Sequence, residues 1–339
     1  MSKRIAVIRG DGIGPEIVDA TLEVLNYLEV PLEYVFIDAG LARWKREGVP
    51  ISEKDLEIIE KCDAVLKGPI ATPVDRKGYR SVNVLLRRFL DLYANIRFFK
   101  SNPLSPVKNL DIVFFRENTE GLYSGVELRP LPGIAISLRV ITEHASRRIL
   151  LRAFKYAVEN SRKKVTVVHK ANILRETCGL FLETAEEIAR DFPQIEVEYS
   201  IVDATAYKLI RNPDNFDVIV TTNMFGDILT DEIAALVGSI GLVPACNLGD
   251  KYAMFEAVHG AAFDIAGKGI ANPIGLMLSA AYMLRYLGFR READRLENAI
   301  WRVLSLGNVL TPDLGGTSTT RELIREVINF LVSDSGHCL

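Results

Sequence analysis

The sequence predicts an α/β fold built around a largely parallel sheet. Apolar runs of strand length alternate with longer segments of helical periodicity along most of the chain. Several of these runs, such as "IAVI" at 5–8, are continuously apolar, as expected of strands that are covered on both faces. The chain has 339 residues, of which 48% are hydrophobic and 25% charged, and this allows about two globular domains with a large core.

The expected elements follow one another in a regular order. Strands are expected at 5–8, 34–37, 64–66, 111–115, 165–169, 197–202 and 217–221. Helices are expected near 15–28, 52–60, 81–91, 143–159, 173–190, 204–211, 226–237, 274–287, 290–306 and 318–332. The first helix is marked by Pro15, which suits the first helical turn, and by Glu16, which suits the positive end of the helix dipole.

One stretch departs from this order. Residues 123–141, "YSGVELRPLPGIAISLRVI", alternate in polarity on both sides of "PLPG", which predicts an antiparallel hairpin that projects from the body. The unpaired edges of a projecting hairpin favour pairing with a second copy of the chain.

The bulk composition excludes several classes of protein. The formal net charge of -3 gives no basic field, so no nucleic-acid partner is expected. No run reaches the ~18 apolar residues of a membrane span, and "IAVI" at 5–8 is too short for the core of a signal peptide. We therefore expect a cytoplasmic protein with no membrane partner. The cysteines have no metal-site spacing and are expected to be plain thiols; they are Cys62, Cys178, Cys246 and Cys338.

The opening glycines raise the question of a nucleotide site. "RGDGIGPE" at 9–16 joins a strand to a helix, but Gly10, Gly12 and Gly14 have the spacing G-x-G-x-G. The dinucleotide fingerprint is G-x-G-x-x-G, so the third glycine comes one residue early. From the motif alone, contact with a phosphate and a plain glycine turn are equally open.

Carboxylates at a metal-ligand spacing lie in "NMFGDILTDE" at 223–232. Asp227 and Asp231 are four residues apart on a predicted helix and share one face, where two like charges repel unless a cation lies between them. Oxygen ligands favour Mg²⁺ or Mn²⁺. The alternative is a solvated acidic helix face, which the apolar neighbours Ile228 and Leu229 disfavour. Asp203, at the end of another predicted strand, is a candidate third ligand.

Candidate acid–base and anion-binding groups lie near other predicted strand ends. Lys170 follows "VTVVH", and a lysine partly removed from water suits proton transfer. Tyr123 lies in a polar turn, and a tyrosine paired with a lysine is a workable proton relay. Arg87, Arg97 and Arg116 carry guanidinium forks that match carboxylates, so converging arginines would suit a substrate with several carboxylates. Taken singly, each residue leaves a structural role open.

Together these motifs resemble one family, the metal-dependent β-decarboxylating dehydrogenases, which includes isocitrate, homoisocitrate, 3-isopropylmalate and tartrate dehydrogenases. The segments "GDGIGPE", "LDLYANIR", "RENTEGLYSG", "VHKANI", "NMFGDILTDE", "HGAAFDIAGKGIANPIG" and "TPDLGG" occur in the family's order over nearly the whole chain. The resemblance implies an isopropylmalate/isocitrate dehydrogenase-like two-domain α/β fold, not a Rossmann fold, with a shared mixed sheet and a protruding β-hairpin arm. It implies a cofactor-binding domain of residues 1–92 plus 238–339. The substrate, metal and dimerisation domain would be 93–237, including the arm at about 123–141.

The resemblance also implies roles for individual residues. Asp203, Asp227 and Asp231 look like the Mg²⁺ or Mn²⁺ ligands. The catalytic groups would be Tyr123 and Lys170 as an acid–base pair, with Asp203. The implied substrate-binding residues are Ser81, Asn83, Arg87, Arg97, Arg116, Tyr123 and Lys170. Lys170 and Asp203 would reach into the active site of a partner subunit, so the implied unit is a homodimer joined by the arm, with a tetramer left open.

The implied cofactor is NAD, bound mainly by "EAVHGAAFDIAGKGIANP" at 256–273. Asp264 and Ile265 look like the NAD-selecting pair, because a carboxylate accepts hydrogen bonds from the ribose hydroxyls and repels a 2′-phosphate. The opening stretch then becomes a tight turn at the edge of the cofactor cleft. The implied cofactor contacts are Ile13, Thr72, Asn172, Glu256, His259, Gly260, Ala261, Ala262, Asp264, Ile265 and Asn272.

The expected reaction follows from these roles. Lys170 helps to remove the substrate hydroxyl proton while hydride passes from C2 to NAD⁺. A metal ion acts as Lewis acid as CO₂ leaves, and Tyr123 then protonates the enolate to give the 2-oxo acid.

The substrate is predicted from Ser81 and Asn83 in "RSVNVLLRR" at 80–88. Isocitrate dehydrogenases typically show S-x-N here, and the hydroxyl and amide can hydrogen-bond a γ-carboxylate. Isopropylmalate dehydrogenases tend to place an apolar residue, often Leu, at the position of Asn83. Isocitrate, homoisocitrate or both are expected, because one methylene changes discrimination by only ~1–3 kcal/mol.

Three alternatives remain. Phe98, Phe263 and the segment 74–79 depart from the family's usual pattern, and 3-isopropylmalate is the second candidate substrate. A non-catalytic regulatory subunit is more remote, because all the catalytic and metal positions named above are present. A generic α/β binding protein is more remote still.

Overall fold

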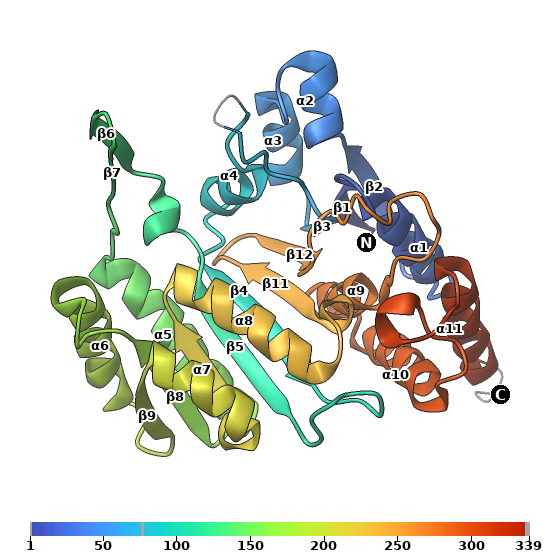
Figure 1. Ribbon diagram of the computed structural model, residues 1–339. Coiled ribbons are helices and arrows are strands. Elements are labelled where there is room, and N and C mark those ends of the chain that lie inside the picture. Colours follow the sequence, from blue (N-terminus) through green and yellow to red (C-terminus); the bar gives the residue numbers. More distant parts are fainter. Residues whose placement is uncertain (1, 76–77, 336–339) are drawn as a thin grey trace.

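A sheet of ten strands runs through the molecule in the order β2-β1-β3-β12-β11-β4-β5-β10-β8-β9 (Figure 1). The computed structural model describes residues 2–75 and 78–335, so Cys338 and residues 76–77 lie outside the described residues. The strands are β1 (Lys3–Ile8), β2 (Leu32–Ile37), β3 (Ala64–Lys67), β4 (Ala94–Lys100), β5 (Asp111–Glu117), β8 (Lys164–His169), β9 (Glu196–Ile201), β10 (Val218–Thr221), β11 (Pro244–Leu248) and β12 (Ala253–Ala257).

Helices connect most of these strands. They are α1 (Gly14–Asn26), α2 (Leu41–Glu47), α3 (Glu53–Glu60), α4 (Val82–Phe89), α5 (Glu143–Glu159), α6 (Arg175–Ala189), α7 (Val202–Arg211), α8 (Asn223–Val237), α9 (Ile274–Tyr286), α10 (Arg290–Leu306) and α11 (Thr320–Ser335). Short 3₁₀ helices lie at Leu122–Ser124, Pro213–Asn215, Ile240–Leu242 and Pro312–Leu314.

The sheet is mixed, as the family resemblance implies. Most neighbouring strands are parallel, but β4 runs antiparallel to both β11 and β5, and β11 runs antiparallel to β12. The chain builds β1 to β3 first and then the half of the sheet from β4 to β9. It then returns with β11 and β12, which fill the space between β3 and β4.

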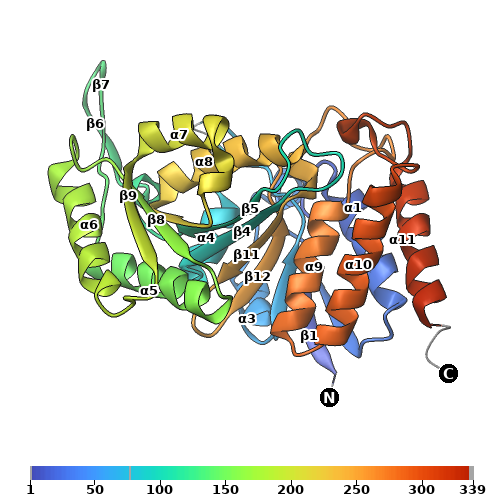
Figure 2. The same cartoon turned by 90° about the horizontal axis from the view of Figure 1, so that it is seen from below.

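Helices cover both faces of the sheet, but only one face has a continuous core. On that face α1, α5, α6, α9, α10 and α11 pack over a single apolar cluster. On the other face, the apolar side chains form two separate clusters, one under α3 and α4 and one under α7 and α8. Figure 2 shows α5 and α8 on opposite sides of the sheet. Between the two clusters the sheet carries buried polar side chains of β4 and β5, including Asn95, Arg97 and Arg116.

The predicted hairpin is confirmed. Strands β6 (Glu127–Leu131) and β7 (Ile134–Ser137) pair antiparallel and project from the body (Figure 1). All residues of both strands are exposed, including Leu128, Leu131 and Ile136. Arg139 joins the base of the hairpin to the body by donating to Thr222 Oγ1 at 3.0 Å.

The middle of the sheet differs from the sequence prediction. Strands β4, β11 and β12 are absent from the predicted elements, because they carry buried polar residues such as Asn95, Asn247 and Glu256 that break the apolar pattern. Helix α8 begins at Asn223, so the predicted start at 226 is wrong. No helix among the described residues is both long and apolar enough to cross a bilayer.

Candidate active site

Two of the predicted clamp arginines share one small cavity. Arg87 on α4 and Arg97 on β4 line a cavity of about 140 Å³. Asn83 and two residues of the predicted cofactor segment, Glu256 and His259, line the same cavity. The predicted substrate groups therefore lie beside the predicted cofactor groups.

Arg116 on β5 is the most deeply buried of the three arginines, with 1% exposure. Its Nη1 donates to Asp227 Oδ1, and its Nε and Nη2 donate to Asn223 Oδ1 at 3.0 and 2.7 Å. Gly226 lies in the first turn of α8 and allows this approach, because a Cβ there would lie 2.7 Å from Arg116 Cγ. Burial lowers the pKa of Arg116 to about 10, and the nearby Arg87 adds to the effect.

Tyr123 contacts the same aspartate. Its hydroxyl donates to Asp227 Oδ2, and the Arg116 guanidinium lies 5.2 Å from the centre of its ring. Burial and the bond to Asp227 raise the pKa of Tyr123, so the phenol keeps its proton near neutral pH. Burial opposes ionisation of Asp227, but Arg116 and the Tyr123 bond outweigh it and lower its pKa. Tyr123 is thus a protonated donor next to an ionised carboxylate.

Asp231 lies one helical turn beyond Asp227, as the spacing predicts. Arg97 Nη1 donates to Asp231 Oδ1 at 3.1 Å, and Arg97 Nη2 lies 3.7 Å from Asp227 Oδ1. Thr230 between them accepts from Arg97 Nη1 at 2.5 Å. Two of the three predicted clamp arginines therefore contact the two predicted metal ligands on α8.

Lys170 and Asp203 form a separate pair. Lys170 follows β8, and its Nζ donates to Asp203 Oδ1 in the first turn of α7. The Asp203 side chain is 69% exposed, so the pair faces outward. Among the described residues, no three histidine, cysteine, aspartate or glutamate side chains come together as a metal site. One chain alone does not bring Asp203 to Asp227 and Asp231.

The residues predicted to bind the γ-carboxylate of the substrate, Ser81 and Asn83, lie at the start of α4. Ser81 is the N-cap of this helix, and its hydroxyl oxygen accepts from Val84 N at 3.4 Å, which leaves its hydrogen free to donate. Asn83 Nδ2 donates to Ile70 O at 3.3 Å, while its Oδ1 is buried and has no hydrogen-bond partner among the described residues. Ser81, Thr72 and Tyr123 also line a groove of about 1130 Å³ beside the hairpin base.

The opening glycine turn packs against the predicted cofactor segment. Ile13 N donates to Ala261 O at 2.9 Å. Gly12 has a φ of 60°, and a Cβ there would lie 1.8 Å from Ala261 O, so only glycine fits this approach. The turn is therefore one wall of the same region, and Ile13 is buried in it.

The remaining predicted cofactor residues are spread unevenly. Asp264 is exposed and Ile265 and Ala262 are partly buried, while His259 Nε2 is buried with no partner among the described residues. Burial lowers the pKa of His259. Asn272 Nδ2 donates to Asp313 Oδ2 at 2.9 Å. Asn172 follows β8, which is five strand positions from β12, so one chain does not bring it to this segment.

Several polar residues of the site are not among those predicted from the sequence. Lys67 is 1% exposed and pairs with Glu256 Oε2 at 2.8 Å. Asn95, Asn118 and Asn247 are buried next to the arginines. Their signal in the sequence is a polar residue inside an apolar strand, which is detectable only once the strand itself is recognised.

Comparison with known proteins decides the family. A family model described as isocitrate/isopropylmalate dehydrogenase matches residues 4–327. The chain belongs to the isocitrate/isopropylmalate dehydrogenase family. This dehydrogenase is 47% identical over 335 residues, 98% of this chain and 100% of the other, to an isocitrate/homoisocitrate dehydrogenase of Thermus thermophilus.

Two further relatives cover this dehydrogenase almost completely. A 3-isopropylmalate dehydrogenase of Archaeoglobus fulgidus is 46% identical over 334 residues, 97% of this chain and 99% of the other. A crystal structure of isocitrate dehydrogenase from Methylococcus capsulatus aligns with a TM-score of 0.93 at 44% identity, over 98% of this chain and 99% of that one. The family is one of metal-dependent β-decarboxylating dehydrogenases, and relatives of nearly equal identity carry different substrate names.

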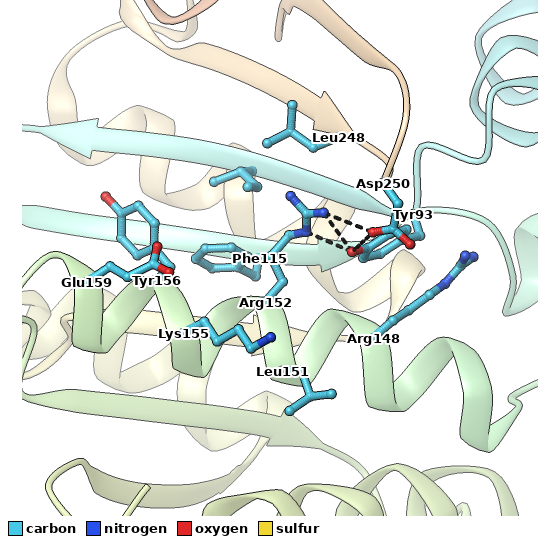
Figure 3. A pocket seen from close by; sticks show the side chains of 11 residues that line it. Tyr93, Phe115, Arg148, Leu151, Arg152, Lys155, Tyr156, Glu159, Leu248 and Asp250 are labelled. Carbon is cyan, nitrogen blue, oxygen red and sulfur yellow. Dashed lines mark hydrogen bonds and ion pairs between the residues drawn. The ribbon is translucent and has the colours of Figure 1, made fainter. Parts of the chain in front are cut away.

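A second cleft of this dehydrogenase lies on the α5 face, away from α8. This cleft has a volume of about 450 Å³. Figure 3 shows the side chains that line it. Arg152 on α5 donates from Nε and Nη2 to the Tyr93 hydroxyl at 2.9 and 2.7 Å, and Tyr93 donates to Asp250 Oδ1 at 2.9 Å. None of the predicted site residues lines this cleft.

Proposed function

We propose that the protein catalyses the NAD-dependent oxidative decarboxylation of isocitrate, homoisocitrate or both. The observation that carries the proposal is the convergence of Arg87, Arg97 and Arg116 beside Asp227 and Tyr123. Buried guanidinium groups are suited to bind the carboxylates of a malate-type hydroxy acid in two-pronged contacts. The product would be the 2-oxo acid, with CO₂ and NADH.

The metal would be Mg²⁺ or Mn²⁺, held by Asp227 and Asp231 of one chain and by Asp203 of its partner. The donor set fits, because all three are carboxylates and the first two face the clamp arginines. When bound, the metal would supply Lewis-acid stabilisation of the charge that develops as CO₂ leaves.

The proton transfers fall to two groups of this chain. Lys170, together with Asp203 or an adjacent water, would help to remove the substrate hydroxyl proton in the site of the partner subunit. Tyr123 would give its proton to the carbon that loses CO₂, and its raised pKa keeps that proton in place near neutral pH.

This arrangement requires a homodimer with shared sites, and a tetramer remains compatible with it. The exposed apolar residues of the hairpin, Leu128, Leu131 and Ile136, support its role as the dimer arm. Within each chain, we propose that residues 1–92 plus 238–339 form the cofactor-binding domain and that 93–237 form the second domain. The free thiols of Cys62, Cys178 and Cys246 suit the reducing cytoplasm.

The preference for isocitrate or homoisocitrate rests on Ser81 and Asn83. The Ser81 hydroxyl at the α4 N-terminus and the second hydrogen of Asn83 Nδ2, whose first bonds Ile70 O, are suited to donate to a γ-carboxylate. 3-Isopropylmalate is the second candidate, because the apolar Val84 and Leu85 line the neighbouring groove.

The preference for NAD rests on Asp264. Its exposed carboxylate would accept from ribose hydroxyls and repel a 2′-phosphate, and Ile265 adds no cation to offset that repulsion. The remaining cofactor contacts are proposed as the sequence predicts them, with Asn172 supplied by the partner.

The test is a parallel assay with Mg²⁺ of isocitrate, homoisocitrate, 3-isopropylmalate, malate and tartrate, each with NAD⁺ and NADP⁺. We expect fastest NADH formation with isocitrate or homoisocitrate. Turnover of isopropylmalate alone would overturn the argument from Asn83. Faster reduction of NADP⁺ would overturn the argument from Asp264.

A further inference from the structure

Buried asparagines lie directly behind the clamp arginines. Asn95 on β4 and Asn247 on β11 are each 0% exposed. The register of β11 against β4 pairs these two residues, so their amides point to the same face of the sheet. Asn118, just after β5, is 2% exposed and reaches the same place. The active-site roles proposed above use none of the three.

Hydrogen bonds through two of these amides connect Arg87 to Arg97. Arg87 Nη2 donates to Glu256 Oε1 at 3.1 Å, and Asn247 Nδ2 donates to the same oxygen at 2.7 Å. Asn247 Oδ1 accepts from Asn95 Nδ2 at 2.8 Å. Asn95 Oδ1 accepts from Arg97 Nε at 3.1 Å. We call Glu256, Asn247 and Asn95 the amide relay.

The direction of each bond in the amide relay is set by Glu256. Burial opposes ionisation of Glu256, but Lys67 and Arg87 outweigh it and hold its pKa well below the ordinary range. An ionised carboxylate only accepts, so Asn247 must turn its NH₂ group toward Glu256. Its oxygen then faces Asn95, which must donate and so presents its own oxygen to Arg97. A reversed amide would set two oxygens or two NH₂ groups against each other.

Asn118 reinforces this orientation. Its Nδ2 donates to Asn247 Oδ1 at 2.9 Å and to Leu92 O at 3.0 Å. The Asn247 oxygen thereby accepts two bonds, which would both be lost if the amide turned over.

Neutral amides have a specific advantage at this place. Arg97 already lies against two carboxylates, those of Asp227 and Asp231. A third carboxylate in the position of Asn95 would orient Arg97 but would add negative charge where substrate carboxylates must bind, whereas an amide oxygen orients the guanidinium and adds none. Arg87 Nε is buried and has no hydrogen-bond partner among the described residues.

We propose that Asn247 is a positioning residue for substrate binding, which sets the orientation of Arg97 relative to Arg87 through the amide relay. The proposal rests on the clamp role proposed above for the two arginines. It assigns Asn247 no contact with the substrate.

The first test is Asn247→Leu, which keeps the number and branching of the side-chain heavy atoms and removes the amide bonds to Glu256, Asn95 and Asn118. We expect the KM for the best hydroxy acid to rise about tenfold or more, because buried donors and acceptors of the relay lose their partners. The kcat should change less than the KM for the hydroxy acid. The KM for NAD⁺ should also rise less, since Glu256, the relay residue proposed to contact the cofactor, keeps its bonds to Lys67 and Arg87. An equal rise in the KM for the hydroxy acid and in the KM for NAD⁺ would contradict the proposal.

The matched control is Asn102→Leu. Asn102 is a buried asparagine after β4 whose Nδ2 donates to Val237 O at 3.2 Å, away from the arginines. Its replacement should lower thermal stability without raising the KM for the hydroxy acid. If Asn102→Leu raises that KM as much as Asn247→Leu does, the effect is general destabilisation and the proposal fails.

The decisive test is the pair Asn95→Leu and Asn247→Leu, singly and combined. Substitutions of two residues in one relay should not have additive effects on the binding free energy. The KM of the double variant should therefore lie within about twofold of the higher KM of the two single variants. Effects that multiply would show two independent roles and overturn the relay. If Asn247→Leu does not fold, Asn247→Ser leaves room for a water and should give an intermediate rise in KM; an unchanged KM would refute the proposal.

Binding measured by calorimetry separates this proposal from the proposed function. If the wild type turns over no hydroxy acid, the proposed function fails, and the Kd for isocitrate with Mg²⁺ takes the place of the KM in each comparison. If the wild type also binds none of the hydroxy acids of the assay, the clamp itself is refuted and the relay with it.

Discussion

Tyr123 and Arg116 are held by opposite oxygens of one carboxylate, that of Asp227. A single side chain on α8 therefore orients both the proposed acid and a proposed clamp arginine. The relationship also gives Asp227 its low pKa in spite of burial.

The first prediction concerns this acid. Tyr123→Phe should lower steady-state turnover about 100-fold, because protonation of the enolate loses its donor. Hydride transfer should survive, so a first turnover of NADH should still appear in rapid mixing. Tyr93→Phe is the matched control, because the Tyr93 hydroxyl lies in the cleft of Figure 3, and it should keep normal turnover. Normal steady-state turnover of Tyr123→Phe would remove this residue from the mechanism.

The second prediction concerns the shared site. Tyr123→Phe and Lys170→Met should each be nearly inactive as pure proteins. Mixed after unfolding and refolding, they should regain about one quarter of wild-type activity, because random pairing gives half mixed dimers with one intact site each. A mixture of two Tyr123→Phe preparations is the control. If mixing restores nothing while mixed dimers form, Lys170 acts within its own chain.

The third prediction concerns the γ group. Asn83→Leu should lower kcat/KM for isocitrate about 10- to 100-fold, since a hydrogen-bonding group is lost, and should raise it for 3-isopropylmalate. The same exchange at Asn160, an exposed residue at the end of α5, should change neither value. A parallel loss for both substrates would mean that Asn83 supports the fold instead of choosing the substrate.

The fourth prediction concerns acid stability. Because the pKa of Glu256 is lower in the folded chain than its ordinary value of 4.5, its contribution to stability is present above pH 4.5 and is lost as the pH falls below it. Urea unfolding between pH 3 and 7 should therefore show a steeper decline for the wild type than for Lys67→Met combined with Glu256→Gln. The double change avoids leaving the buried Lys67 ammonium unpaired. If the free energy of unfolding falls with pH equally steeply in both proteins, Glu256 does not have the low pKa assigned to it in the folded chain.

The sequence predicts the outer elements of the fold well and the middle of the sheet poorly. Strands such as β8 and β10 are rich in valine and isoleucine, and α5 has a clear amphipathic period. β4, β11 and β12 bury polar side chains on the face of the sheet that carries the site. A polar residue in a short apolar run is normally expected to be exposed, so the hydrophobic pattern does not predict these strands. The same physical fact explains both the missed strands and the missed residues Asn95 and Asn247.

The sequence predicts individual site residues where their spacing is recognisable. It does not predict which of them contact residues far away in the chain. The i, i+4 spacing places Asp227 and Asp231 on one face of α8, as the structure confirms. Nothing local relates Lys67 to Glu256 or Arg87 to Glu256, which are joined only by the return of the chain. The predicted grouping of Asp203 with the α8 aspartates stays a prediction, because it depends on a second chain.

The return of β11 and β12 into the centre of the sheet has a consequence for synthesis. Val65 of β3 pairs with Met254 of β12, so β3 leaves the ribosome long before its neighbour exists. At usual translation speeds that interval lasts roughly 10 to 40 seconds. During this time β3 has an open edge, and Val7 and Leu66 lack those members of their apolar cluster that come from α9, α10 and α11. This dehydrogenase should therefore depend on chaperones while it is being made, more than a chain whose sheet is completed in sequence order.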